Sequence, residues 1–278
     1  MRKLTLTAKI MVLLAIVFTC LATQGQEYYL FAGTYTSGKS EGIYVFRFNA
    51  KTGQVVPTDT LRNIDNPSYL VVSGNGNFVY AVTENGGSKP GMVNALAFNQ
   101  TTGKLRLLNS KPSKGDYPCY ITVSKDNKWV MAGNYGGGNL VAYATAEDGS
   151  LSDRLQVIAH SGKGIDKNRQ EGPHVHATIF SPDEKYLLVP DLGIDKIMAY
   201  RFDPASSGNP LQAAAKPFTG IPAGHGPRHL AFHPTGKWVY LMEEMAGAVS
   251  AWKYSKGGLE PMQEIDAHAP GYAGDRSE

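Results

Sequence analysis

The sequence predicts an all-β fold, a β-propeller built from four-stranded antiparallel blades. Glycine accounts for 31 of the 278 residues and charged residues for only 18%, a composition that favours many tight turns over helices. A strand–turn–strand unit recurs four times, and no stretch after the first 26 residues has the apolar period of a useful amphipathic helix. The hydrophobic content of 42% excludes a disordered chain.

The first 26 residues have the pattern of a cleaved secretory signal, with residues 27–278 forming the propeller domain. Arg2, Lys3 and Lys9 precede an apolar run from about residue 10 to residue 22, followed by small and polar residues. That run of about 13 residues is shorter than the ~20 needed to span a bilayer. We therefore expect a secreted or periplasmic protein with no membrane span.

The leader contains Cys20, which we do not expect to be a lipoprotein cysteine. The three residues before it, Val17-Phe18-Thr19, lack the small side chains that such processing prefers. Outside the leader, Cys119 is the single cysteine, so no intrachain disulfide is expected and the domain must be held by its core.

The charge of the domain is balanced. Three of the 27 Lys and Arg residues and none of the 24 acidic residues lie in the leader, so the remainder carries 24 basic and 24 acidic groups. A nucleic-acid-binding surface needs clustered Lys and Arg, so we expect no nucleic-acid partner.

Four hairpins form the repeat. Each is anchored on a polar residue at the end of a short apolar strand, and the anchors lie 51, 57 and 52 residues apart: Ser73, Ser124, Ser181 and His233. Five residues after each anchor an aromatic opens the second strand: Phe78, Trp129, Tyr186 and Trp238. A polar turn separates anchor and aromatic, as hairpins require. We expect the four aromatics to be buried at equivalent positions between sheets.

Two further strands complete each unit. Alternating segments at residues 42–48, 92–98, 196–202 and 248–254 are each followed by a glycine-containing turn and another short strand. Four strands in ~53 residues are typical of one propeller blade.

The register also predicts how the chain ends. Residues 29–35 align with residues 129–135, so the first blade should lack its innermost strand, and the next anchor is expected only near residue 286. We therefore expect about four and a half to five blades in an open arc with unpaired edges.

Several motifs resemble one family. They are Arg169-Gln170-Glu171-Gly172-Pro173-His174-Val175-His176, Asp191-Leu192-Gly193-Ile194-Asp195-Lys196, Gly226-Pro227-Arg228-His229, Phe232-His233-Pro234-Thr235-Gly236-Lys237 and Asn134-Tyr135-Gly136-Gly137-Gly138. Together they resemble the seven-bladed propeller lactonases of the 6-phosphogluconolactonase type, which are related to the carboxy-muconate lactonising enzyme. The resemblance covers residues 28–278 and implies a ring of seven blades and hydrolysis of a lactone.

The repeat register gives a reason for a site at one mouth of the channel. His176 and Arg228 stand five residues before their anchors, where the other units carry Ser68 and Cys119. Glu244 stands eleven residues after its anchor, at the end of the second strand. Because adjacent antiparallel strands place the start of one beside the end of the other, we expect Arg228 and Glu244 to meet.

The resemblance to the muconate enzyme implies a His, an Arg and a Glu at the site, which match His176, Arg228 and Glu244. Opening a lactone with water needs a general base and a group that stabilises the oxyanion. We assign His176 or Glu244 as the base and Arg228 as the oxyanion partner. Arg228 as a purely structural ion-pair partner of Glu244 is the competing interpretation.

Four further residues complete the predicted substrate-binding set. Arg169 and His174 are expected to hold a phosphate or carboxylate, a task that suits the arginine fork. Asp191 and Glu84 lie at the ends of second strands, beside the same mouth.

We expect no metal and no cofactor. His174 and His176 share one strand face, and His225 and His229 lie nearby in the next repeat, but no third ligand has a fixed spacing to them. The sequence also lacks a cluster of oxygen ligands suited to calcium.

The partner is expected to be a small-molecule lactone or sugar acid. An exported protein fits poorly with a phosphorylated intracellular substrate, so plain and phosphorylated lactones both stay open. A non-catalytic exported propeller that binds a sugar acid or a protein is the alternative function, because fold alone does not fix function.

Overall fold

The computed structural model describes residues 27–272 and 274, which form five antiparallel sheets. The predicted leader lies outside the described residues. The first sheet, blade 1, contains β1 (Glu27–Ala32), β2 (Ile43–Asn49) and β3 (Val55–Leu61). Blade 2 contains β4 (Leu70–Val72), β5 (Phe78–Thr83), β6 (Met92–Asn99) and β7 (Lys104–Pro112).

The other three blades repeat this order. Blade 3 contains β8 (Pro118–Val123), β9 (Trp129–Asn134), β10 (Asn139–Thr145) and β11 (Leu151–Ala159). Blade 4 contains β12 (Ile179–Phe180), β13 (Tyr186–Asp191), β14 (Lys196–Phe202) and β15 (Leu211–Gly220), with the short 3₁₀ helix η1 (Leu192–Ile194) after β13. Blade 5 contains β16 (Pro227–Phe232), β17 (Trp238–Glu243), β18 (Ala248–Ser255) and β19 (Gly258–Asp266).

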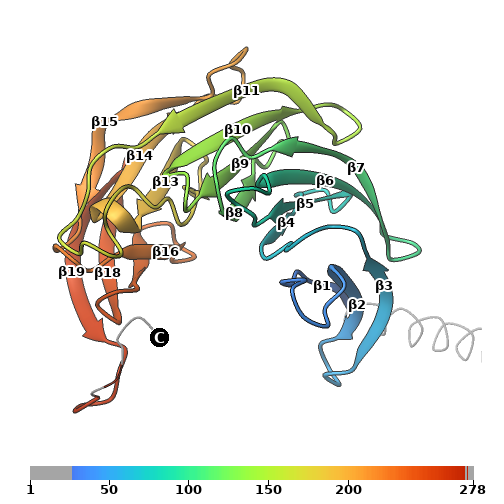
Figure 1. Ribbon diagram of the computed structural model, residues 1–278, viewed down its shortest axis with the longest axis horizontal. Helices are drawn as coiled ribbons and strands as arrows, with labels where there is room; N and C mark the ends of the chain where they lie inside the picture. Colours follow the sequence, from blue (N-terminus) through green and yellow to red (C-terminus); the bar gives the residue numbers. More distant parts are fainter. Residues whose placement is uncertain (1–26, 273, 275–278) are drawn as a thin grey trace, which may run out of the picture.

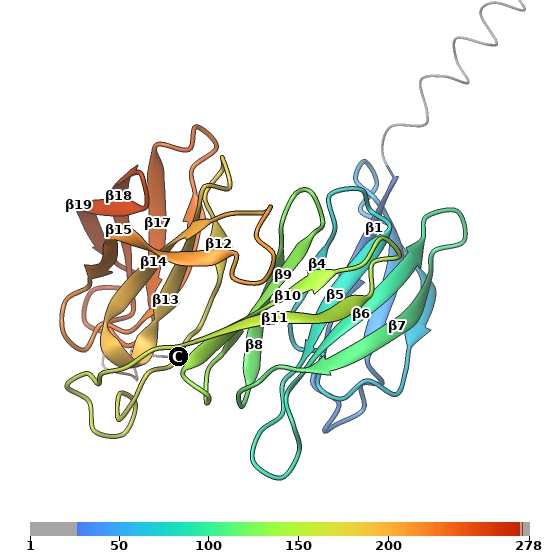
Figure 2. The same cartoon turned by 90° about the horizontal axis from the view of Figure 1, so that it is seen from above.

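The blades follow one another around an arc, from β1–β3 to β16–β19 (Figure 1). Seen from above, β8–β11 lie between the earlier and the later blades (Figure 2). The repeat of four antiparallel strands is confirmed, as is a three-stranded first blade among the described residues. No helix in residues 27–272 is long and apolar enough to cross a membrane.

The anchors are serine or histidine because their side chains close the hairpin turn. In each hairpin the anchor amide donates to the carbonyl of the aromatic five residues later, at 2.8 to 2.9 Å. At the three serine anchors the hydroxyl also accepts from the amide of that aromatic, at 3.0 Å for Ser73, 3.1 Å for Ser124 and 3.0 Å for Ser181. His233 uses ring Nδ1 instead, which lies 2.8 Å from Thr235 Oγ1. The anchors therefore fix where each second strand begins.

The four aromatics are equivalent, but the prediction that all are buried was wrong. They open β5, β9, β13 and β17, and only Trp129 is fully buried. Phe78 and Tyr186 pack at the turn end of their strands against a glycine of the next blade, Gly149 and Gly257. The turn of the next blade covers one side of each of these two rings, and the rest of the ring stays partly exposed.

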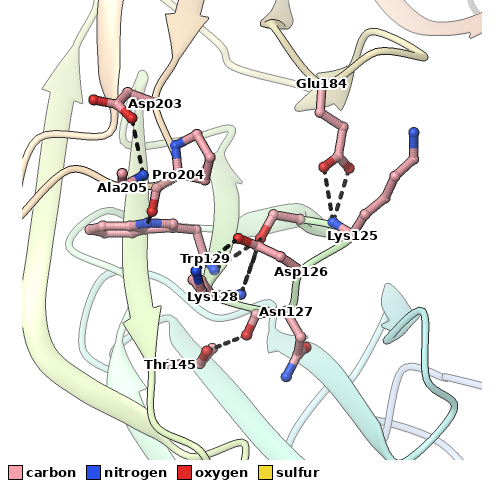
Figure 3. Close-up of polar contacts among 11 residues, drawn as sticks. Lys125, Asp126, Asn127, Lys128, Trp129, Thr145, Glu184, Asp203, Pro204 and Ala205 are labelled. Carbon is pink, nitrogen blue, oxygen red and sulfur yellow. Dashed lines mark hydrogen bonds and ion pairs between the residues drawn. The ribbon is translucent and has the colours of Figure 1, made fainter.

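Blades 3 and 4 are also joined by polar contacts at these turns (Figure 3). Both carboxylate oxygens of Glu184 accept from the amide of Lys125 at 3.0 Å. The indole Nε1 of Trp129 donates to the carbonyl of Pro204 at 3.2 Å. These contacts hold one blade against the next at the strand ends opposite the cavity described below.

The core lies between neighbouring sheets. All six residues of β9 are buried: alternate side chains pack toward blade 4, as Trp129 and Met131 do, or toward blade 2, as Val130 and Ala132 do. The middle strands of the arc are therefore covered on both faces. Because these strands are packed on both faces, the residues at their ends are held in defined positions.

Candidate active site

A cavity of about 420 Å³ lies where the inner ends of the blades converge. Residues from blades 1, 2, 3 and 5 and from the segment before β12 line it: Tyr35, Ser68, Tyr69, Glu84, Cys119, Tyr135, Arg169, His176, Arg228, His229 and Glu244. The volume suits a small metabolite.

The repeat register accounts for much of this lining. All four residues that stand five positions before an anchor face the cavity: Ser68, Cys119, His176 and Arg228. Eleven positions after the anchors, Glu84, Tyr135 and Glu244 also line it, whereas Leu192 is buried in the core. The predicted ring of unlike side chains at one mouth is therefore present.

Glu244 is the centre of the polar contacts on the blade 4 and blade 5 side. Arg228 Nε donates to its Oε2 at 2.8 Å, and Arg169 Nη2 donates to its Oε1. His176 Nε2 lies 3.7 Å from the same Oε2. The sequence thus correctly places His176, Arg228, Glu244 and Arg169 together, and Arg228 with Glu244 in direct contact.

Arg169 comes from the long segment between β11 and β12. Gln170, which is buried, anchors this segment by donating to the carbonyl of Leu192 at 2.9 Å, while the Arg169 amide donates to Asp166 Oδ1 at 3.0 Å. Hydrogen bonds to Glu244 and Tyr135 raise the pKa of Arg169 above its usual range. Arg169 is therefore a permanent cation held in place by its own loop.

His176 lies just before β12 and not within a strand, because β12 has only two residues. Val175 forms an isolated bridge with Asp191, and the His176 amide donates to the carbonyl of Pro190 at 3.0 Å. Burial, and then the charge of Arg228, lower the pKa of His176 to about 4. The imidazole is therefore neutral at pH 7.

His229 is a second neutral imidazole beside the first. Its ring centroid lies 5.2 Å from that of His176, and burial followed by the Arg228 charge lowers its pKa to about 4. It packs edge-on against Tyr120, which stacks on Tyr69 with centroids 4.2 Å apart. Of these rings, His176, His229 and Tyr69 line the cavity, and Tyr120 supports them from behind.

Glu84 forms a separate acidic group on the blade 2 side. Tyr35 Oη donates to Glu84 Oε2 at 2.8 Å, and Ser68 Oγ donates to the same oxygen. Burial and then Glu84 raise the pKa of Tyr35 to about 12, so the phenol keeps its proton. Burial, with Glu84 adding to it, also raises the pKa of the Cys119 thiol to about 12, which makes this cysteine a poor nucleophile.

Two predicted substrate-binding residues lie outside the cavity lining. Asp191 is fully buried, where its Oδ1 accepts from the amides of His174 (2.7 Å) and Gly193 (3.1 Å), and its Oδ2 lies 2.6 Å from His160 Nδ1. The His174 ring stacks on Tyr135, with centroids 4.4 Å apart. These partners let Asp191 and His174 order the loop and the Tyr135 ring, and neither side chain reaches the cavity directly.

Tyr35, Tyr69 and His229 line the cavity but were missed from the sequence. Tyr35 is the first-blade equivalent of Tyr135, since residues 29–35 align with residues 129–135. Tyr69 and His229 each stand four residues before an anchor, one place after the predicted ring position. Extending the register by one residue would have found both.

The four histidines considered as zinc ligands are divided between different contacts. His174 stacks on Tyr135, whereas His225 Nδ1 lies 2.5 Å from Glu243 Oε2 at the end of β17. His225, Glu243 and Glu264 form the one group of three in residues 27–272 whose ligand atoms lie within 4.8 Å. Glu243 is already satisfied there by His225 and by the hydroxyl of Ser250.

Comparisons with known proteins agree with the propeller fold. The family model described as "Lactonase, 7-bladed beta-propeller" matches residues 29–278. A Bacillus subtilis protein named 6-phosphogluconolactonase is 34% identical over 243 residues, which cover 87% of this chain and 67% of that protein.

Two solved structures have the same architecture. A Bacteroides fragilis structure is 39% identical, with a TM-score of 0.84 over 89% of this chain and 70% of its own. The structure of a periplasmic gluconolactonase from Pseudomonas aeruginosa is 35% identical, with a TM-score of 0.83 over 90% of this chain and 70% of its own. From the match of the family model over nearly all of the described residues, this chain belongs to the seven-bladed β-propeller lactonases, a family of lactone-hydrolysing enzymes.

Proposed function

We propose that this protein hydrolyses the lactone of a sugar acid by general-base attack of water, without a metal ion. The observation that carries the proposal is the convergence of His176, Arg228 and Arg169 around Glu244 in one small cavity. Lactone opening needs a proton acceptor and a cation next to the carbonyl oxygen, and this cluster offers both.

His176 is the base in this mechanism. Its imidazole is neutral, and its Nε2 lies at the cavity wall, 3.7 Å from Glu244 Oε2. Both oxygens of Glu244 are already occupied by guanidinium groups, Oε1 by Arg169 and Oε2 by Arg228. With both oxygens engaged in this way, Glu244 serves to orient the two arginines and the imidazole, and the unpaired Nε2 of His176 is left to accept the proton.

Arg228 stabilises the oxyanion. Its Nε is bound to Glu244, and its Nη1 lies 3.4 Å from His229 Nδ1, so the fork has further N–H donors for a substrate oxygen. Water attacks the carbonyl carbon and gives its proton to His176. The tetrahedral intermediate then expels the ring oxygen, which takes up that proton, and the product is a hydroxy acid that releases its carboxyl proton to solvent.

Two relatives support a sugar-acid lactone as the substrate class. One is named 6-phosphogluconolactonase and the other is a periplasmic gluconolactonase. The periplasmic relative and the secretory pattern of residues 1–26 together support export from the cytoplasm. Export places the substrate among the lactones found outside the cytoplasmic membrane.

The test is a hydrolysis assay with the purified protein on phosphorylated and plain aldonolactones, followed by acid release in weak buffer. Ring opening above the spontaneous rate, lost in His176→Gln and Arg228→Lys, supports the proposal. Binding of sugar acids without any turnover of a lactone would overturn it in favour of a non-catalytic binding platform.

A further inference from the structure

The two carboxylates of the cavity have opposite surroundings. Glu244 is bound by Arg169 and Arg228, whereas Glu84 makes no ion pair with any residue in 27–272. The cavity lining holds two guanidiniums and two carboxylates, and its histidines are neutral at pH 7. The pocket as a whole therefore has no net positive charge to attract an anion.

The geometry around Glu84 suits hydroxyl groups. Its Oε2 accepts from Tyr35 Oη at 2.8 Å and from Ser68 Oγ, while Oε1 accepts no hydrogen bond from the described residues. The hydroxyl groups of Tyr35 and Ser68 donate their hydrogen atoms to Glu84, and their oxygen lone pairs remain available as acceptors. A carboxylate oxygen beside two hydroxyl oxygens is a set of acceptors for the O–H groups of a polyol.

The same arrangement is unfavourable for a phosphoryl group. Next to Glu84, a phosphate dianion meets a carboxylate with no compensating cation, in a partly buried site where screening by water is reduced. On the other side, a phosphate must share Arg169 and Arg228 with Glu244 and with the lactone oxygen that Arg228 stabilises in the proposed mechanism, so neither arginine is free to neutralise a dianion.

We propose that Glu84, with Ser68 and Tyr35, binds the hydroxyl-bearing end of an uncharged aldonolactone and selects against the phosphorylated form. This inference rests on the proposed lactonase function and adds the substrate class. It places the lactone carbonyl beside Arg228 and His176 and the polyol chain toward blade 2. Glu84 thus determines specificity and takes no part in the proton transfer.

The experiment compares kcat/KM for D-glucono-1,5-lactone and for its 6-phosphate. The wild-type protein is expected to prefer the uncharged lactone by about tenfold or more, because charged partners make the larger hydrogen-bond contributions. Glu84→Gln keeps the shape and removes the charge, so the ratio should move toward the phosphorylated lactone by about tenfold. Glu147→Gln removes the same charge from an exposed turn and should leave the ratio unchanged.

A second variant separates hydrogen bonding from charge. Tyr35→Phe removes one hydrogen bond to Glu84 and no charge, so KM for the uncharged lactone should rise while the preference over the phosphate remains. It also tests the site if Glu84→Gln does not fold. A wild-type preference for the phosphorylated lactone, or a Glu84→Gln ratio equal to that of Glu147→Gln, would overturn the inference.

Binding measurements keep this test apart from the test of the proposed function. Calorimetry with D-glucitol and D-glucitol 6-phosphate needs no turnover. If neither lactone is hydrolysed but glucitol binds more tightly than its phosphate, the catalytic proposal fails and the hydroxyl-binding site stands. If both lactones are hydrolysed and the phosphorylated compounds react and bind better, the lactonase proposal stands and this inference fails.

Discussion

Arg228 Nε lies 2.8 Å from Glu244 Oε2, so the start of β16 is joined to the residue that follows β17 across one hairpin. Antiparallel pairing alone brings these two backbone positions together. This contact is compatible with both interpretations of Arg228. Arg228 is an ion-pair partner of Glu244, and its side chain also lines the cavity, where it can face a substrate. Activity and stability measurements on the same variant distinguish the two.

Arg228→Lys keeps the positive charge and loses the planar fork. An ammonium group cannot hold Glu244 and a substrate oxygen in the same geometry, so kcat/KM for lactone hydrolysis should fall about 10²-fold. The melting temperature should change little, because the pair is partly exposed. Arg106→Lys, on an exposed stretch of β7, is the matched control. A large loss of stability with unchanged kcat/KM would leave Arg228 with a structural role only.

His176→Gln removes the proposed base and retains a hydrogen-bonding side chain. Loss of general-base catalysis should lower kcat by about 10²- to 10⁴-fold, measured on a lactone that the wild type hydrolyses. His229→Gln serves as the comparison, since it removes the neighbouring imidazole and leaves His176 in place. It should mainly raise KM, and a larger fall in kcat for His229→Gln than for His176→Gln would transfer the role of base to His229.

The pH dependence of kcat/KM follows from the lowered pKa of His176, about 4, which burial and Arg228 produce. The base must be unprotonated, so kcat/KM should be constant from about pH 5 to pH 8 and fall as the pH drops through 4. Tyr35 and Cys119, with raised pKa values of about 12, add no limb in this range. A midpoint near 6.5, after correction for spontaneous hydrolysis, would show that the base is an ordinary exposed imidazole.

The fold was predictable from the sequence because the same pattern of strands and turns recurs in each repeat, so each unit supports the assignment of the others. The third-strand segment predicted at residues 196–202 is β14, and the segment predicted at 92–98 is β6 within one residue. Burial of the aromatics was harder to predict. It depends on how far the turn of the next blade extends over each ring, a contact between residues that lie about 70 apart for Phe78 and Gly149.

The candidate site was predictable where the register alone places a side chain. His176, Arg228, Glu244 and Glu84 occupy fixed repeat positions, and all four line the cavity. Asp191 also occupies such a position, at the end of β13, but its side chain is buried on the other face of the strand, where it binds the His174 amide and His160. Strand alternation reverses the direction of a side chain with every residue, so a shift of one position separates Asp191 from the cavity.

The contact between Phe78 and Gly149 gives a stability prediction that does not depend on the site. Gly149 has φ of 83°, and a Cβ built on it would lie 2.3 Å from ring atoms of Phe78. Gly149→Ala therefore adds a steric clash to the cost of a left-handed backbone, and should lower the free energy of unfolding by about 2 to 4 kcal/mol. Gly53 has a similar φ of 71°, and a Cβ built on it would have no heavy atom within 4 Å, so Gly53→Ala should cost only the backbone strain, about 1 kcal/mol.

Urea unfolding of the Gly149→Ala and Gly53→Ala variants measures the difference. The double variant Phe78→Leu with Gly149→Ala should recover part of the lost stability, because the smaller side chain makes room for the new methyl group. Equal destabilisation by the two glycine substitutions would show that the ring does not press on the turn of the next blade.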